Sequence, residues 1–136
     1  MNEKPRVLLV EDNPADANLV EEALAEAQLD CDLSVMRNGA QAIEFIERLD
    51  SGASQESPDL VLLDLNLPKV SGTAVLERVR LSPKVGSVKV FIISSSDAPA
   101  DRDRALKLGA SGYFRKPSNL AQFMELGSKV RAMLEE

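Results

Sequence analysis

The chain has 136 residues, a net charge of −6, one cysteine and no histidine. This length suits one domain that can build its own hydrophobic core. A single cysteine excludes an internal disulfide and is typical of a reducing compartment. The absence of histidine excludes a histidine phosphodonor, a histidine-based metal site and a Ser-His-Asp hydrolase. The negative charge disfavours sequence-independent binding to nucleic acid, because such binding depends on neutralising phosphates.

The apolar residues are distributed as in a folded protein outside the membrane. They make up 44% of the chain, which argues against disorder. Charges interrupt every apolar run before the ~18 residues that a membrane-spanning helix needs. Residues 1–5 lack the apolar core of a signal peptide. We therefore expect a soluble, cytoplasmic protein that binds neither membrane nor nucleic acid.

Short apolar runs alternate with amphipathic stretches five times, starting with a buried strand over residues 7–10. Asn13 is a good N-cap and Pro14 fits the first helical position, so a helix is expected next. Residues 31–35 alternate apolar and polar side chains, which predicts a strand exposed on one face.

The alternation continues to the end of the chain. A helix opened by Asn38-Gly39 is expected next, followed by a polar loop over 51–57 and a buried strand over 60–63. A helix from Ser71-Gly72, a buried strand over 88–93, a helix over 99–108 and a strand over 112–114 then follow. The last expected element is a helix capped by Ser118, whose inward-facing residues are Leu120, Phe123, Met124, Val130 and Leu134.

Five strand-then-helix units predict an α/β fold with a doubly wound, five-stranded parallel sheet and right-handed crossovers. We expect the flavodoxin-like strand order 2-1-3-4-5, with the half-exposed second strand at an edge. Ligands of such sheets bind beyond the carboxyl ends of the strands, where the order reverses between strands 1 and 3. The sequence thus predicts one domain, residues 1–136, with its site at that edge.

Three carboxylates follow the two strands that meet at this point. Glu11 and Asp12 follow the first strand, and Asp64 ends the third. Like charges this close raise one another's pKa and need a cation to stay ionised. A hard divalent ion, most plausibly Mg²⁺, prefers such oxygen ligands. A single acid at a strand end is usually only solvated, but three at the expected functional edge favour a metal site.

Two further strand ends carry polar groups to the same edge. The fourth strand ends at Ser94-Ser95-Ser96, and the fifth at Lys116-Pro117. Hydroxyl runs and Lys-Pro pairs are ordinarily turn residues. An ammonium, a hydroxyl and a metal ion around one carboxylate are nevertheless suited to binding a phosphoryl group.

Over nearly its whole length the sequence resembles the receiver domain of two-component response regulators. The resemblance rests on four segments in order: residues 7–13, residues 59–68 with Gly72, residues 92–96 and residues 109–117. It implies a phosphoacceptor switch, not an enzyme with its own substrate, that uses Mg²⁺ and a sensor histidine kinase as partner. No output domain is expected on this chain. Asn13-Pro14-Ala15-Asp16 and the 51–57 loop resemble the single-domain receivers paired with phytochrome-type kinases.

The resemblance also implies a role for each site residue. Asp64 is the expected phosphoacceptor, Asp12 a direct Mg²⁺ ligand, and Glu11, where many members carry Asp, a ligand acting largely through metal-bound water. The backbone carbonyl of Asn66 is expected to bind the metal, and the Lys116 ammonium to pair first with the acids and then with the phosphoryl oxygens. Ser94 is the expected switch hydroxyl, in place of the commoner Thr, and the rotamer of the Tyr113 ring is expected to change with it. The resemblance also implies a cis peptide bond at Lys116-Pro117.

Phosphorylation of Asp64 is expected to draw in Ser94 and then Tyr113, altering the face formed by the fourth helix, fifth strand and fifth helix. This face is expected to control partner binding or to take part in a phosphorelay. The fourth helix has charges of both signs, which fit either a solvated helix face or a homodimer interface: Asp101, Arg102, Asp103, Arg104 and Lys107.

Three other functions are compatible with this fold. A phosphohydrolase with an aspartate nucleophile usually has a second Asp two residues later, where this chain has Asn66. A flavin-binding electron carrier needs a phosphate loop where Glu11-Asp12 would repel phosphate. An interaction module that is never phosphorylated is the third alternative, although the intact site residues weigh against it.

Overall fold

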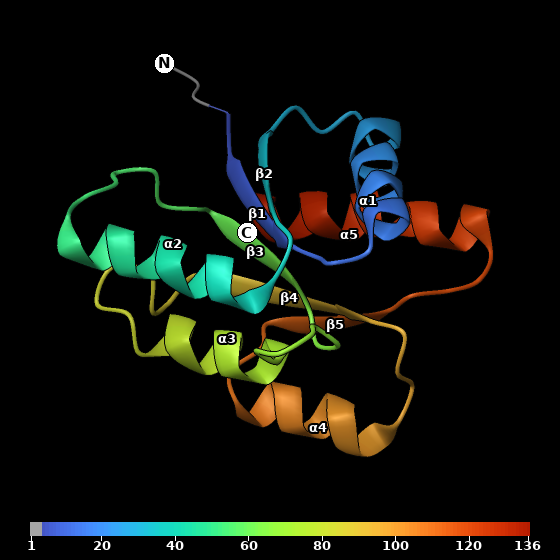
Figure 1. The fold of residues 1–136 in the computed structure, drawn as a ribbon. Helices are drawn as coiled ribbons and strands as arrows, with labels where there is room; N and C mark the ends of the chain where they lie inside the picture. The colour runs from blue at the N-terminus through green and yellow to red at the C-terminus, as the bar shows by residue number, and fades with distance from the viewer. Residues whose placement is uncertain (1–3) are drawn as a thin grey trace.

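The computed structural model describes residues 4–136, in which a parallel sheet is covered by helices on both faces (Figure 1). The strands are β1 (Arg6–Val10), β2 (Asp32–Met36), β3 (Leu60–Asp64), β4 (Lys89–Ser94) and β5 (Gly112–Arg115). The helices are α1 (Pro14–Glu26), α2 (Gly39–Ser51), α3 (Gly72–Arg80), α4 (Pro99–Lys107) and α5 (Leu120–Glu135).

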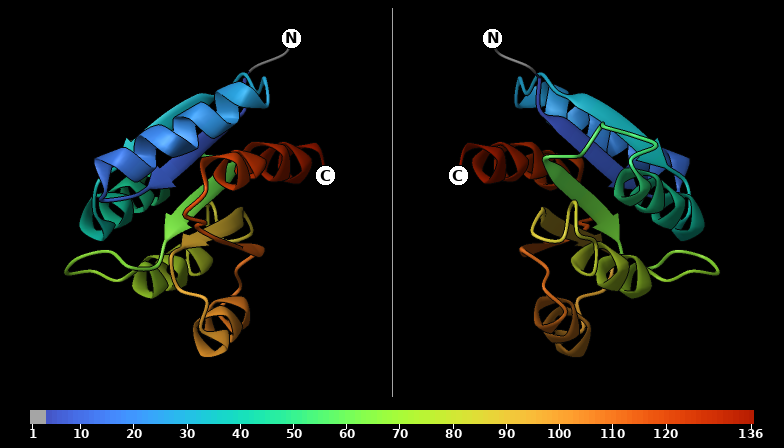
Figure 2. Two further views of the ribbon diagram at one scale, coloured as in Figure 1. Left: turned by 90° about the vertical axis from the view of Figure 1, so that its right-hand side faces the viewer. Right: turned by 90° about the vertical axis from the view of Figure 1, so that its left-hand side faces the viewer.

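The sheet has the order β2-β1-β3-β4-β5, and every neighbouring pair of strands is parallel. The predicted fold class and strand order are therefore confirmed. Helices α1 and α5 cover one face of the sheet, and α2, α3 and α4 cover the other (Figures 1 and 2). The order reverses between β1 and β3, which places the switch point at the carboxyl ends of these two strands.

The central strand β3 is buried along its whole length. Leu60 and Leu62 pack into the layer of α1 and α5, whereas Val61 and Leu63 pack into the layer of α2 and α3. A continuous apolar run is what a parallel strand covered on both faces requires. The edge strand β2 alternates exposed and half-buried residues, as its sequence pattern predicts.

Helix caps follow the sequence except at α5. Asn13, Asn38 and Ser71 cap α1, α2 and α3 as expected. For α5 the expected cap was wrong: Asn119, not Ser118, caps the helix by accepting a hydrogen bond from the backbone N–H of Gln122. Both residue types cap well, so the helix start decides between them.

Leu120 also differs from the prediction, because 58% of its surface is exposed. It is the first residue of α5 and lines a surface hollow together with Met124 and with Ala25 of α1. The buried face of α5 is formed by Phe123, Leu126, Gly127 and Val130. Leu120 thus lies outside the stripe that reaches the sheet.

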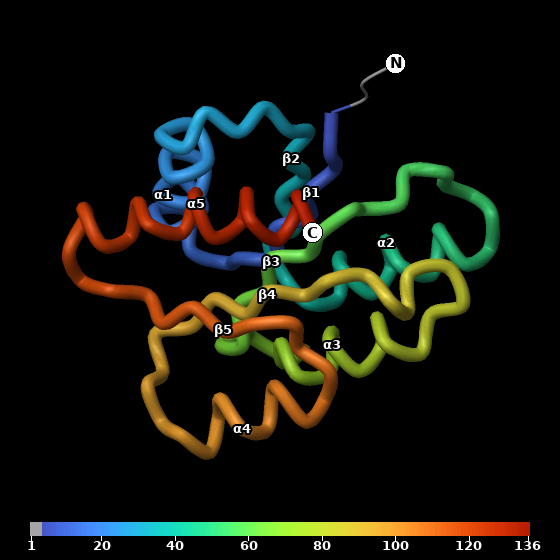
Figure 3. The backbone as a smooth tube through the Cα atoms, turned by 180° about the vertical axis from the view of Figure 1, so that it is seen from behind, coloured from blue at the N-terminus to red at the C-terminus, as the bar shows by residue number. Residues whose placement is uncertain are grey.

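Helices α1 and α5 lie side by side, as Figure 3 shows from behind. Their backbones approach closely at Gly127, where an added Cβ would collide with the carbonyl oxygen of Ala23 and lie 2.8 Å from the Cβ of Ala27. This contact helps to hold α1, which begins directly after the strand-end acids. Within residues 4–136 none of the helices has the length and apolar character needed to span a bilayer.

Candidate functional site

The adjacent carboxyl ends of β1 and β3 bring Glu11, Asp12 and Asp64 together. Each offers a carboxylate oxygen, and these three oxygens lie within 4.8 Å of one another. Glu11 and Asp64 are buried, whereas Asp12 is exposed to solvent. Three oxygen ligands that converge beside open solvent fit a hard divalent cation that keeps several waters. The acidic cluster expected from the sequence is thus present, and its chemistry suits Mg²⁺.

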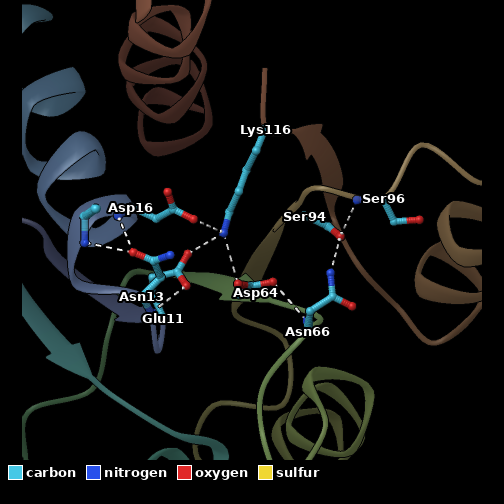
Figure 4. A network of polar contacts seen from close by, with 9 residues as sticks. Glu11, Asn13, Asp16, Asp64, Asn66, Ser94, Ser96 and Lys116 are labelled. Carbon is cyan, nitrogen blue, oxygen red and sulfur yellow. Dashed lines mark hydrogen bonds and ion pairs between the residues drawn. The ribbon is translucent and has the colours of Figure 1, made fainter. Parts of the chain in front are cut away.

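Lys116, which directly follows β5, extends its side chain to this cluster (Figure 4). Its Nζ lies 2.6 Å from Oε1 of Glu11, 2.8 Å from Oδ2 of Asp16 and 3.0 Å from Oδ2 of Asp64. The three hydrogens of the ammonium can therefore each be donated to a carboxylate. The backbone N–H of Lys116 donates to the carbonyl of Ser94 at 2.7 Å, which joins the end of β5 to the end of β4.

Asp16 was not expected among the site residues. Sequence reasoning used it only within the segment that resembles single-domain receivers. The available signal was its position three residues after the N-cap Asn13, in the first turn of the helix that follows β1. This position places its carboxylate at the same edge of the sheet as Glu11.

The Lys116–Pro117 peptide bond is a correction to the sequence-based expectation. The resemblance implied a cis bond, but no peptide bond among residues 4–136 is cis. The trans form is the favoured isomer before proline, by about 0.5–1 kcal/mol. With this trans bond the ammonium of Lys116 still reaches all three carboxylates.

Burial and neighbouring charges shift two pKa values at the site. Burial raises the pKa of Glu11 from 4.5 to about 7; the hydrogen bond from Lys116 opposes this rise, and neighbouring Asp64 adds to it. Burial lowers the pKa of Lys116, but hydrogen bonds with Asp16 and Glu11 outweigh burial and hold that pKa above its ordinary value. The ammonium is therefore charged at neutral pH, and the buried carboxylate of Glu11 favours a cation beside it.

The raised pKa of Glu11 is expected to make Mg²⁺ binding depend on pH. A metal ion binds the ionised carboxylate, so below pH ~7 it must displace a proton. The apparent Mg²⁺ affinity should be constant above about pH 7 and fall by up to about tenfold for each pH unit below it. Calorimetric titration with Mg²⁺ at a series of pH values measures this profile.

The same shift sets the sign of a stability effect in the metal-free protein. The folded state binds the Glu11 proton more tightly than the unfolded chain does, because its pKa is about 7 and not 4.5. This contribution to stability is complete below about pH 4.5 and is lost as pH rises through about 7.

Glu11→Gln is the matched control for the Mg²⁺ titrations and should remove the dependence of the Mg²⁺ affinity on pH. A wild-type Mg²⁺ affinity that is independent of pH across this window would contradict the pKa of Glu11.

Ser94 ends β4 and is fully buried. Its Oγ accepts a hydrogen bond from the backbone N–H of Ser96 at 3.1 Å and a weaker one from Nδ2 of Asn66 at 3.4 Å. The backbone N–H of Asn66 in turn donates to Oδ1 of Asp64 at 2.9 Å. The expected switch hydroxyl is therefore connected through Asn66 to the expected phosphoacceptor, as Figure 4 shows.

Tyr113 lies half-buried on β5, and its hydroxyl donates to the carbonyl oxygen of Ser96 at 2.9 Å. Ser96 thus contacts Ser94 through its N–H and Tyr113 through its carbonyl. Its Oγ donates to Oδ2 of Asp101 in the first turn of α4 at 2.6 Å. Sequence reasoning gave Ser96 no part in the switch; its position two residues after Ser94 was the only available signal.

The charged side chains of α4 are exposed, as expected. The guanidinium carbon of Arg102 lies 6.0 Å from the centre of the Tyr113 ring. Asp97 forms an exposed ion pair of 3.6 Å with Arg115 on β5. The face of α4 and β5 therefore has charges of both signs around the ring of Tyr113.

The fold and site together define a class: a doubly wound α/β protein with a cation-ready acidic cluster and a lysine at its switch point. Residues 7–126 match the model of the response regulator receiver domain. The chain therefore belongs to the response regulator receiver domain family of two-component signalling proteins. Membership of this family favours the function of a receiver domain over those of a flavin-binding electron carrier and a phosphohydrolase.

Several characterised proteins share this domain. Response regulator Rcp1 of Synechocystis is 32% identical over 88% of this chain and 82% of its own length. The two-component response regulator ARR17 of Arabidopsis thaliana is 30% identical over 93% of this chain and 84% of its own length.

Solved structures show the same likeness. The phosphorylated cyanobacterial phytochrome response regulator RcpA superposes with a TM-score of 0.88 at 30% identity, covering 98% of this chain and 96% of its own. The Mn²⁺-bound form of Rcp1 superposes with a TM-score of 0.84 at 31% identity, covering 96% and 93%.

Proposed function

We propose that this protein is a phosphoacceptor response regulator that takes a phosphoryl group onto Asp64 from a phosphohistidine of a sensor kinase in the cytoplasm. The observation that carries this proposal is the position of the Asp64 carboxylate, which lies beside two further acids and 3.0 Å from the ammonium of Lys116. A carboxylate in this setting can act as a nucleophile while cationic groups balance the charge of the incoming phosphoryl group.

The transfer step forms one bond to phosphorus and breaks another. An oxygen of Asp64 bonds to phosphorus as the phosphorus–nitrogen bond of the donor breaks, and the bonding electrons leave with the imidazole, which takes up a proton from water. Glu11, Asp12, Asp64 and the backbone carbonyl of Asn66 would hold Mg²⁺, which when bound neutralises charge on the phosphoryl oxygens. Lys116, 3.0 Å from Asp64, is placed to donate to a phosphoryl oxygen.

The product would be read through Ser94 and Tyr113. When the Ser94 hydroxyl turns to a phosphoryl oxygen, it releases the N–H of Ser96, whose carbonyl holds the Tyr113 hydroxyl. The ring of Tyr113 can then turn inward and change the face formed by α4, β5 and α5. One covalent charge thus re-weights two conformations. This face would bind a downstream partner or a second copy of the chain, or pass the phosphoryl group on in a relay.

The kinase is proposed to be of the phytochrome type. The proposal is supported by the likeness to RcpA, whose structure is that of a cyanobacterial phytochrome response regulator, and to the bacteriophytochrome response regulator RtBRR, which superposes with a TM-score of 0.79. Phosphotransfer profiling against the histidine kinases of the host tests this pairing. Transfer from a phytochrome-type kinase at least about tenfold faster than from the others supports it.

Labelling with a small phosphodonor tests the phosphoacceptor function itself. The wild-type protein is expected to incorporate phosphoryl label in the presence of Mg²⁺, and the bond should be labile in base and to hydroxylamine, as an acyl phosphate is. Removal of the metal by a chelator should abolish incorporation. No incorporation with Mg²⁺ from either the small phosphodonor or a panel of phosphorylated kinases would favour the alternative of an unphosphorylated interaction module.

A further inference from the structure

Asp16 differs from the other carboxylates that contact Lys116. Glu11 and Asp64 belong to the cluster that could hold a metal ion, and Asp16 does not. Figure 4 shows Asp16 reaching the ammonium from α1, and Asp64 reaching it from β3. The Nζ of Lys116 is within 3.0 Å of all three, so the contact with Asp16 does not draw the ammonium away from Asp64.

The position of Asp16 is set by the start of α1. The Oδ1 of the N-cap Asn13 accepts hydrogen bonds from the backbone N–H groups of Ala15 and Asp16, at 2.9 and 3.2 Å. The next residue, Ala17, is buried under the helix. The backbone of Asp16 is therefore held firmly, while 28% of its side-chain surface is exposed, compared with 1% for Glu11.

The need for such a contact arises during phosphoryl transfer, so the argument rests on the proposed function. Lys116 carries its charge on a flexible four-carbon stem. When a metal ion occupies the cluster and a phosphoryl group is added to Asp64, the oxygens of Glu11 and Asp64 are engaged by these groups. Asp16 is the carboxylate among the three that remains available to the ammonium throughout.

We propose that Asp16 is a positioning residue that keeps the Lys116 ammonium beside Asp64 during phosphoryl transfer. It does so as a fixed hydrogen-bond acceptor on α1. Without it, the lysine stem must be ordered in each transfer, which slows the reaction. The opposite electrostatic effect, in which a further negative charge repels the phosphoryl group, is the smaller one, because the ammonium lies between Asp16 and Asp64 and is in contact with both.

Three variants separate position from charge. Asp16→Ala removes the acceptor and the charge, Asp16→Asn keeps an acceptor oxygen and removes the charge, and Glu22→Ala removes a charge from an exposed position on the same helix. With a small phosphodonor and Mg²⁺, Asp16→Ala is expected to be phosphorylated about tenfold more slowly than wild type. Asp16→Asn should lie within about threefold of wild type and Glu22→Ala should equal it.

A second readout does not depend on phosphorylation. Nitrogen-15 NMR of the lysine side chains with Mg²⁺ saturating, so that the metal engages Glu11 and Asp64, should show a protected, slowly exchanging Lys116 ammonium, assigned through its loss in Lys116→Arg. This signal should persist in Asp16→Asn and Glu22→Ala and disappear in Asp16→Ala. Circular dichroism would confirm that the variants are folded.

The outcomes distinguish this proposal from the proposed function. An unchanged ammonium signal in Asp16→Ala, or phosphorylation of that variant at the wild-type rate or faster, would overturn the positioning role. Equal slowing of Asp16→Ala and Asp16→Asn would also overturn it, because charge and not position would then matter. Failure of the wild-type protein to be labelled would instead contradict the phosphoacceptor function, while the ammonium spectrum would still report the contact.

Discussion

Asp64→Asn is expected to abolish phosphorylation by a small phosphodonor, lowering the rate at least about 100-fold. An amide has no anionic oxygen with which to attack phosphorus, so it cannot form the acyl phosphate. Asparagine has nearly the same shape as aspartate and keeps an acceptor for the backbone N–H of Asn66. The loss should therefore occur without unfolding. Incorporation of radioactive label over time, with Mg²⁺ saturating, measures the rate.

Asp59→Asn is the matched control for this substitution. Asp59 precedes β3 at its amino end and accepts a hydrogen bond from the backbone N–H of Arg6 at 2.8 Å. It carries the same functional group as Asp64 at the opposite edge of the sheet, so its replacement should leave the labelling rate unchanged. Undiminished label in Asp64→Asn would show that another residue accepts the phosphoryl group.

Gly127→Ala is expected to destabilise the protein markedly through a single added methyl group. The added Cβ would collide with the backbone carbonyl of Ala23 on α1, which cannot rotate away as a side chain can. The two helices must therefore separate. Overpacking of this kind costs about 2 kcal/mol in net free energy of unfolding, even though alanine favours a helix more than glycine does. The fall in Tm should be about 5–10 °C.

The neighbouring Ser128→Ala provides the control, because Ser128 is exposed on the same helix. Its free energy of unfolding should change by less than about 0.5 kcal/mol. Chemical denaturation of both variants gives the comparison. If Gly127→Ala were as stable as wild type, the close approach of α1 and α5 would not limit the packing. Because α1 carries Asp16, the separation should also weaken the contact between Asp16 and Lys116.

The order of elements and the location of the acids could be read from the chain alone. Apolar runs, alternation and helical spacing are local properties, and they identified all five strands and the caps Asn13, Asn38 and Ser71. The general rules for parallel sheets then placed Glu11 and Asp64 at one switch point. The site was therefore predictable because its acids lie directly at strand ends, where topology determines which groups meet.

Contacts between helices and loops were outside the reach of such rules. The contact of Asp16 with Lys116 joins residues 100 positions apart, and it depends on how α1 rests against the sheet. The two roles of Ser96 and the close approach at Gly127 likewise depend on packing distances that periodicity does not contain. The start of α5 was misjudged because adjacent cap residues have similar energies. Leu120 was misjudged because it lies in the first turn of α5, before the stripe that reaches the sheet begins at Phe123. Such near-equal local choices are settled only when the whole chain is packed.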